Sequence, residues 1–301
     1  MDYRRPIQFG YFPTPAAASY PELLRLAQLC DALGMDLIGI QDHPYQSRFM
    51  DTWTLLSALA AQTARIRFFP DVINLPLRPP AVLAKAAASL DIISGGRIEL
   101  GLGAGAFWEA IAAMGGPVRT PGEAVAALEE AIQVIRLMWS GQRGLRFDGQ
   151  HYRLKGVHSG PVPAHPIGIW IGAYGPRMLA LTGRLGDGWV PTSTYAPPDK
   201  LPEMHRRIDS AALSAGRDPG MIQRVYNLMG QIQDRPGGEP FIGPVGQWVA
   251  ELTRLVLEFG MDTFIIGFPE PPGDQIERFM AEIAPRVREN VAGERSVSRA
   301  S

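Results

Sequence analysis

The sequence has a single cysteine, Cys30, almost no net charge and no long apolar run. One cysteine excludes an internal disulfide framework and a cysteine zinc cluster, which is typical of a reducing compartment. Because 29 Lys and Arg face 30 Asp and Glu, for a net charge of −1, no basic surplus exists for nucleic acid or an anionic membrane. No segment approaches the roughly 18 apolar residues of a membrane span, and residues 1–12 lack a signal-peptide core. We therefore expect a cytoplasmic protein that acts on small molecules.

The composition favours one large domain, residues 1–301, since 46% of the residues are hydrophobic and only 20% are charged. Short apolar segments alternate with helical stripes about every 30 residues, which is typical of parallel βαβ units. The expected strands cover residues 7–12, 37–41, 66–73, 98–102, 167–171, 188–191, 224–231 and 262–267. Eight such units predict an α/β fold, the (β/α)8 TIM barrel with insertions, with an open doubly wound sheet as the alternative.

Several helix ends are marked by capping residues. Ser19 with Glu22 three residues later, and Thr120 with Glu123, are typical of helix starts. Gly34 follows an apolar stripe and predicts the end of the first helix.

Three segments break the rhythm of the chain. Residues 104–119 delay the fourth helix and predict an insertion. Residues 141–166 are rich in Gly, Pro, Arg and His, and the Asp-Gly pair within them predicts a small hairpin. Residues from about 291 onward lack apolar periodicity, so we expect a frayed tail.

Polar residues follow the second expected strand, at the end where a barrel places its active site. His43 is a candidate for proton transfer, and the adjacent Asp42 for a supporting charge. Neighbouring strand residues point to opposite faces, so the alternative is that Asp42 caps a loop and His43 bonds a neighbouring strand. No second histidine lies at metal-ligand spacing, and we expect no catalytic metal.

Two glycine-rich segments are candidates for ligand binding. Residues 101–106 match a weak dinucleotide pattern, but no long helix follows directly. The glycines therefore either let a strand end approach a planar ligand or form a turn. Residues 172–177 run from a strand into a helix start with Arg177 on its first turn, which suits a phosphate, although a plain helix start is the alternative.

The segments GGRIELGLGAG (95–105), NLPLRPP (74–80) and GDGW (186–189) resemble the bacterial luciferase-like flavin and deazaflavin oxidoreductase superfamily. The resemblance covers residues 6–285 and implies a (β/α)8 barrel with insertions. It also implies that the barrel mouth holds FMN or the deazaflavin coenzyme F-420 (F420), with the phosphate near residues 172–177.

Residues 41–44 (QDHP) are more similar to the deazaflavin-dependent branch, so the resemblance favours F420 with FMN as the alternative. It implies that His43 is the acid/base and that Asp42 tunes it, and it places a non-prolyl cis peptide at Asp71–Val72. The cofactor-binding candidates are Tyr11, Asp71, Val72, Asn74, Gly103, Gly105, Gly172, Ala173, Gly175, Pro176 and Arg177. The substrate-pocket candidates are Phe12, Phe107, Trp108, Glu109 and Tyr174. Ala106 stands where sugar-phosphate dehydrogenases of this branch carry glutamate, so that activity is not expected.

The leading hypothesis is a luciferase-like oxidoreductase that transfers a hydride between F420 and a small organic substrate. An FMN-dependent monooxygenase that uses reduced FMN and oxygen is the alternative. A non-catalytic flavin-binding protein is a hypothesis of another class, as is a barrel hydrolase or lyase that uses Asp71 and Glu109. The sequence leaves open whether the protein forms a homodimer.

Overall fold

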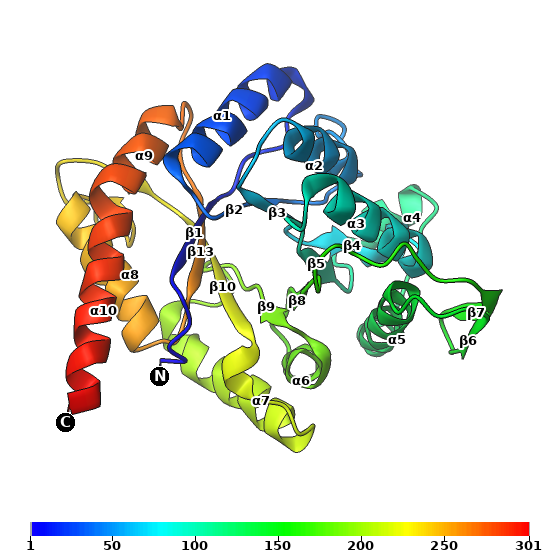
Figure 1. The fold of residues 1–301 in the computed structure, drawn as a ribbon. Coiled ribbons are helices and arrows are strands. Elements are labelled where there is room, and N and C mark those ends of the chain that lie inside the picture. Colours follow the sequence, from blue (N-terminus) through cyan, green and yellow to red (C-terminus); the bar gives the residue numbers. More distant parts are fainter. Residues whose placement is uncertain (1, 301) are drawn as a thin grey trace.

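Eight parallel strand positions close into a barrel in the computed structural model, which describes residues 2–300 (Figure 1). In chain order the positions are β1 (Gln8–Tyr11), β2 (Leu37–Ile40), β3 (Arg67–Pro70) with β4 (Ile73–Asn74), β5 (Leu100–Gly103), β8 (Ile169–Ile171), β9 (Gly188–Trp189), β10 (Gln223–Met229) and β13 (Thr263–Gly267). Neighbours follow the order β3-β2-β1-β13-β10-β9-β8-β5-β4. The pairing of β4 with β5 and a parallel bridge from Phe68 to Ile98 close the ring. The predicted TIM barrel is confirmed.

The helices surround the barrel (Figure 1). They are α1 (Tyr20–Leu33), α2 (Thr52–Ala61), α3 (Pro80–Ser94), α4 (Trp108–Ala113), α5 (Pro121–Trp139), α6 (Pro176–Leu185), α7 (Leu201–Ser214), α8 (Val245–Leu257), α9 (Gly273–Arg278) and α10 (Ala284–Ala300). A π-helical turn, Phe279–Ile283, joins the last two, and short 3-10 turns cover Ala17–Ser19, Leu75–Leu77, Pro198–Lys200 and Pro219–Met221. None of these helices is long and apolar enough to cross a membrane.

The strands are buried on both faces, which explains their continuous apolar runs. Inside the barrel, one cluster consists of Leu37, Phe69, Trp170, Val190, Val225 and Ile265. A larger cluster fills the space between the strands and the helices. The inner cluster therefore fills the barrel interior below the C-terminal ends of the strands.

The two predicted insertions have different structures. Residues 104–119 form a loop that contains the short helix α4. Within residues 141–166, β6 (Leu145–Asp148) and β7 (Arg153–Val157) form the predicted antiparallel hairpin, which projects beside α5 in Figure 1. The Glu130 carboxylate on α5 accepts the backbone N–H groups of residues 150–152 and fixes the hairpin turn. A further parallel pair, β11 (Gln231–Ile232) and β12 (Ile242–Gly243), lies before α8.

Two of the capping predictions are confirmed and one is wrong in its detail. Thr120 and Glu123 form a reciprocal capping box, and Gly34 ends α1 in the left-handed conformation with φ 77°. Ser19 is the N-cap of α1 but makes no side-chain capping bond there. The Glu22 carboxylate instead accepts hydrogen bonds from the Arg25 guanidinium.

The predicted frayed tail is wrong, because α10 continues to Ala300. Val291 is buried against the core. The Arg295 guanidinium bonds the carboxylate of Asp2 at 2.8 Å and the carbonyl oxygen of Arg5 at 2.9 Å. These contacts join the two ends of the chain, and local periodicity does not reveal them.

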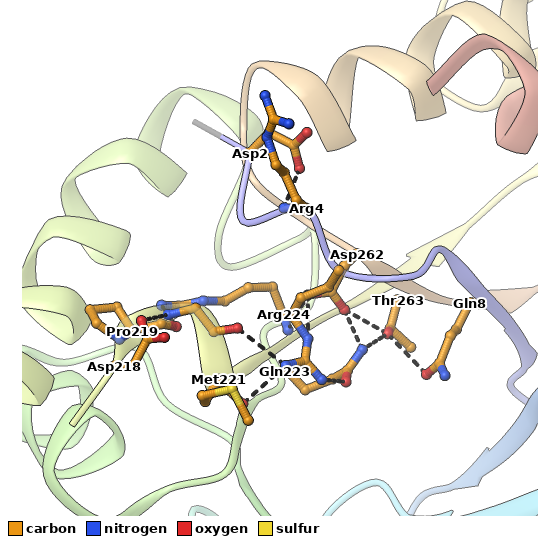
Figure 2. A network of polar contacts seen from close by, with 12 residues as sticks. Asp2, Arg4, Gln8, Asp218, Pro219, Met221, Gln223, Arg224, Asp262 and Thr263 are labelled. Atoms are coloured by element: carbon orange, nitrogen blue, oxygen red, sulfur yellow. Dashed lines mark hydrogen bonds and ion pairs between the residues drawn. The ribbon is translucent and has the colours of Figure 1, made fainter. Parts of the chain in front are cut away.

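A polar network closes the N-terminal end of the barrel (Figure 2). The side-chain amide of Gln223 donates to Asp262 and to Thr263, and Asp262 also accepts the backbone N–H of Arg224 at 3.0 Å. Burial raises the pKa of Asp262 to about 6, although a hydrogen bond from the Thr263 hydroxyl, the backbone N–H of Arg224 and the charges of Arg5 and Arg224 oppose the shift.

Candidate active site

A cavity of about 410 Å³ lies at the C-terminal ends of the strands. Its walls come from the segments that follow β1, β2, β3, β5, β8 and β9, and from β10 itself. The lining residues are Phe12, Gln41, Asp42, His43, Tyr45, Asp71, Val72, Ile73, Asn74, Gly103, Ala104, Gly105, Ala106, Phe107, Gly172, Tyr174, Gly175, Met178, Val190, Thr192 and Asn227. Its volume is in the range of small-molecule and cofactor sites.

Asp42 lines the cavity and is held there in an ion pair. Its side chain is 0% exposed and faces the Arg78 guanidinium, which donates to its two oxygens at 2.8 and 2.9 Å. Asp42 also accepts the backbone N–H of Asn74 at 2.9 Å, and Arg78 donates in addition to Asp51. Asp42 therefore anchors the segment after β2 to the third strand position, and its charge is already compensated.

His43 turns away from Asp42 and lines the cavity. Its Nδ1 lies 2.7 Å from the Tyr45 hydroxyl, and its ring packs edge-on against Phe107 at 5.7 Å between centroids. Burial lowers the pKa of His43, although the nearby Asp42 carboxylate opposes the shift. The imidazole is therefore neutral near pH 7. A neutral imidazole in a cavity is suited to accept a proton.

The third strand is interrupted by a bulge with a cis peptide bond at Asp71–Val72, as the resemblance implied. Glycines surround the Val72 side chain: a Cβ on Gly103 would lie 2.8 Å from Val72 Cγ2, and one on Gly172 would lie 3.1 Å from it. A Cβ on Gly101 would lie 2.0 Å from the carbonyl oxygen of Pro70. These glycines thus make room for the bulge, a role that neither sequence alternative, a close approach to a ligand or a turn, included.

The floor of the cavity is polar and incompletely hydrogen-bonded. Asn227 Nδ2 donates to Asp71 Oδ1 at 2.9 Å. Among the described residues, no partner reaches Asp71 Oδ2, Asn74 Oδ1 or Asn227 Oδ1, although all three atoms are buried. Burial raises the pKa of Asp71 to about 7, and the bond from Asn227 opposes this shift. Buried polar atoms without partners are uncommon, and here the three residues that carry them all line the cavity.

A second cavity of about 450 Å³ adjoins the first and shares Ala104, Gly105, Gly175 and Met178 with it. Its remaining lining residues are Trp108, Pro121, Ala124, Val125, Pro176 and Arg177. The N-cap of α6, Gly175, has no side-chain capping bond. Arg177 is exposed, and its Nη1 lies 3.5 Å from where a Cβ on Gly122 would stand, so it reaches the first turn of α5. Free amides at a helix start beside a guanidinium suit an anion.

The structure brings most of the predicted residues together and leaves six outside the first cavity. Trp108, Pro176 and Arg177 line only the second cavity. Tyr11 and Ala173 are buried in the outer core, and Glu109 is exposed on the first turn of α4; none of these three lines either cavity. The remaining candidates line one cavity or both, and their roles stay predictions.

Sequence reasoning missed several residues of the cavity. Asn227 lies near the end of β10, so the rule that barrel sites use strand ends was sufficient to find it. Tyr45 and Arg78 gave no such signal, because their contacts with His43 and Asp42 depend on how the loops turn back. Within residues 2–297, no group of three or more His, Cys, Asp or Glu side chains forms a metal site.

Comparison with known proteins adds the family. The luciferase-like monooxygenase family model matches residues 6–236. An F420-dependent glucose-6-phosphate dehydrogenase of Nocardia farcinica is 32% identical over 231 residues, which cover 74% of this chain and 68% of the relative. The chain thus spans about two thirds of the length of that relative.

Two solved structures share the fold. An F420-dependent secondary alcohol dehydrogenase in complex with an F420-acetone adduct has a TM-score of 0.81 at 19% identity, covering 94% of this chain and 99% of that chain. The oxygenating constituent of 3,6-diketocamphane monooxygenase from Pseudomonas putida, in complex with FMN, has a TM-score of 0.75 at 18% identity. It covers 93% of this chain and 98% of that one.

Proposed function

This chain belongs to the luciferase-like monooxygenase family, and we propose that it is an oxidoreductase that transfers a hydride between coenzyme F420 and a small organic substrate. The relative that is 32% identical is F420-dependent, which supports F420 over FMN. The observation that carries the proposal is the pair of joined cavities at the barrel mouth.

The residues present fit an F420-type cofactor. The first cavity has the size for a tricyclic ring, and its floor offers buried polar atoms that lack partners among the described residues. The second cavity has Arg177 and the free amide end of α6 for an anionic tail. We propose that Val72 supports the ring and that Arg177 holds the phosphate. The ring, when bound, takes or gives a hydride.

His43 is the proposed acid/base. Oxidation of an alcohol to a carbonyl compound releases a hydride from carbon and a proton from oxygen, and the proton needs an acceptor beside the substrate. His43 is neutral near pH 7 and lines the cavity. When Nδ1–H donates to the Tyr45 hydroxyl oxygen, it fixes the orientation of the ring and leaves the lone pair of Nε2 to accept the substrate proton. Asp42 acts as a positioning residue, because its oxygens are occupied by Arg78 and the backbone of Asn74.

The substrate we propose is uncharged and largely apolar. Of the described residues that line the first cavity, none is Lys or Arg. Aromatic side chains rim the opening: Phe107 is 57% exposed and Tyr174 is 39% exposed. A sugar phosphate would find no cation there to replace its hydration, and it would lie near the carboxyl of Asp71.

Equilibrium titration with F420 and FMN side by side tests the function. We expect F420 to bind more tightly than FMN, and the bound F420 absorbance to change when a neutral alcohol is added. Tighter binding of FMN would favour the monooxygenase that uses reduced FMN and oxygen. Binding of either ring without any absorbance change with reductants or candidate substrates would indicate a non-catalytic flavin-binding protein. Binding of neither ring would overturn the proposal and favour the barrel hydrolase or lyase.

A further inference from the structure

The cavity floor contains a carboxyl group in an unusual position. Asp71 is only 9% exposed and lies in the bulge between β3 and β4. One of its oxygens accepts a single hydrogen bond from Asn227. The other oxygen, Oδ2, is buried and has no partner among the described side chains and backbone groups. A buried carboxylate normally needs a cation or several N–H donors, and Asp71 has one neutral donor.

Within the part of the chain that the structure describes, the surroundings of Asp71 supply no compensating positive charge. From the end of β2, the cavity presents His43, which is neutral near pH 7, and Asp42, whose charge Arg78 already balances. From the segment after β8 comes Tyr174, a phenol whose pKa burial raises. Arg78, the cation next to this wall, is occupied by two other carboxylates.

The direction of Oδ2 follows from its neighbours. A Cβ on Gly39 of β2 would lie 2.9 Å from Asp71 Oδ2 and 2.7 Å from the Phe69 ring. Phe69 belongs to the cluster inside the barrel, so the carboxyl lies above that cluster and beneath the cavity. Asp71 lines the cavity, so Oδ2 is buried at the cavity floor with its hydrogen-bonding capacity unused by the described residues.

We propose that Asp71 is a neutral acid in the complex and donates a hydrogen bond from Oδ2 to an acceptor atom of the bound ring, so that ring binding takes up a proton. The inference rests on the proposed function, because the ring is that of F420. The edge of a flavin-type ring carries carbonyl oxygens and ring nitrogens that accept hydrogen bonds. A carboxylate at Oδ2 would repel these acceptors, whereas a protonated carboxyl pairs with one of them. The raised pKa of Asp71, about 7, is consistent with this state.

The substitution Asp71→Asn provides a matched test, because an amide has the shape of a protonated carboxyl. Its oxygen can still accept from Asn227, and its NH₂ group can donate in place of Oδ2. Calorimetric titration with F420 in buffers of different ionisation enthalpy gives the number of protons taken up. For the unmodified protein we expect about one proton per F420 at pH 8.5 and nearly none at pH 5.5. For Asp71→Asn we expect nearly none at either pH.

The affinities give a second readout. Relative to Asp71→Asn, the unmodified protein should lose affinity for F420 by about tenfold per pH unit above pH 7.5, and the two should agree at pH 5.5. Titration of F420 itself is common to both proteins and cancels in this ratio. Asp71→Leu should bind F420 weakly at every pH. Asp199→Asn, which changes an exposed carboxylate to an amide, should behave like the unmodified protein.

The outcomes separate the two proposals. Tight binding of F420 with equal proton uptake by the unmodified protein and Asp71→Asn at pH 8.5 overturns the role of Asp71 and leaves the proposed function standing. Failure of F420 to bind at any pH overturns both.

Discussion

We predict that the two partners of the Asp42–Arg78 ion pair differ in how much their removal lowers the free energy of unfolding. Arg78→Met keeps the apolar stem of the side chain and leaves the Asp42 carboxylate, 0% exposed, with the backbone N–H of Asn74 as its remaining donor in the described structure. Removing one partner of a buried pair costs about 3–5 kcal/mol, because the other charge is left uncompensated. We expect Arg78→Met to lower the free energy of unfolding by that amount.

The reciprocal change should cost less. In Asp42→Asn, Arg78 is 19% exposed on its side chain, keeps Asp51 as a partner and can reach water. The loss is then one charge-assisted pair, about 1.5–3 kcal/mol. The double variant should cost less than the sum of the two single variants, because no uncompensated charge remains.

Urea unfolding followed by tryptophan fluorescence measures all three variants. Arg153→Met is the control, since Arg153 pairs with Asp148 on the surface with side chains 65% and 89% exposed, and such pairs contribute about 0–1 kcal/mol. A cost for Arg78→Met no larger than that of the control, or a cost for Asp42→Asn that exceeds that of Arg78→Met, would refute the reasoning.

Three further predictions concern the cavities. His43→Ala should lower turnover by about 10²-fold or more with F420 affinity nearly unchanged, as expected for proton transfer; steady-state rates with a parallel binding titration check this, and full activity removes His43 from the mechanism. Arg177→Ala should weaken F420 binding by about 1.5–3 kcal/mol through loss of a charge-assisted phosphate contact, and an unchanged dissociation constant rejects that contact. Asp71→Asn should be more stable than the unmodified protein at pH 8 but not at pH 4, measured by urea unfolding of the protein without cofactor. The folded state raises the pKa of Asp71 from 3.8 to about 7, so its contribution to stability is present below pH 4 and is lost as the pH rises to 7, by about 4 kcal/mol. Equal pH profiles would show that Asp71 ionises in the folded protein as it does in the unfolded chain.

The fold was predictable because its signals are local. Each strand position is an apolar run, and each predicted run contains the strand that the structure shows, apart from one residue or two at the ends. The end of the chain was not predictable, since α10 continues through contacts between Arg295 and the first residues, which are distant in sequence. The cap at Ser19 failed locally: Glu22 pairs with Arg25, three residues further along the same helix, and Ser19 makes no side-chain capping bond.

The sequence predicted which strand ends form the site, but it predicted less well which side chains there face the cavity. Along β1, a Cβ on Gly10 would meet Leu37 and Ile265 of the inner cluster, so Gly10 faces the barrel interior. Side chains alternate along a strand, which turns Tyr11 toward the helices and Phe12 back into the cavity. The same alternation turns Ala173 outward. The alternation of side chains therefore excludes Tyr11 and Ala173 from the cavity, although both lie at strand ends.

The two cavities differ in the charged side chains that line them, and this difference determines which part of a ligand each can bind. The side chains that line the first cavity include no Lys or Arg within the described part of the chain, and its carboxyl groups are either paired, as in Asp42, or shifted toward the neutral form, as in Asp71. The second cavity has the exposed cation Arg177 and a free helix start. An anion that entered the first cavity would lose hydration without gaining a counter-ion, whereas the second cavity offers one. The anionic part of a ligand that occupies both should therefore lie against α6, which leaves the surroundings of His43 to neutral groups whose protons the imidazole can move.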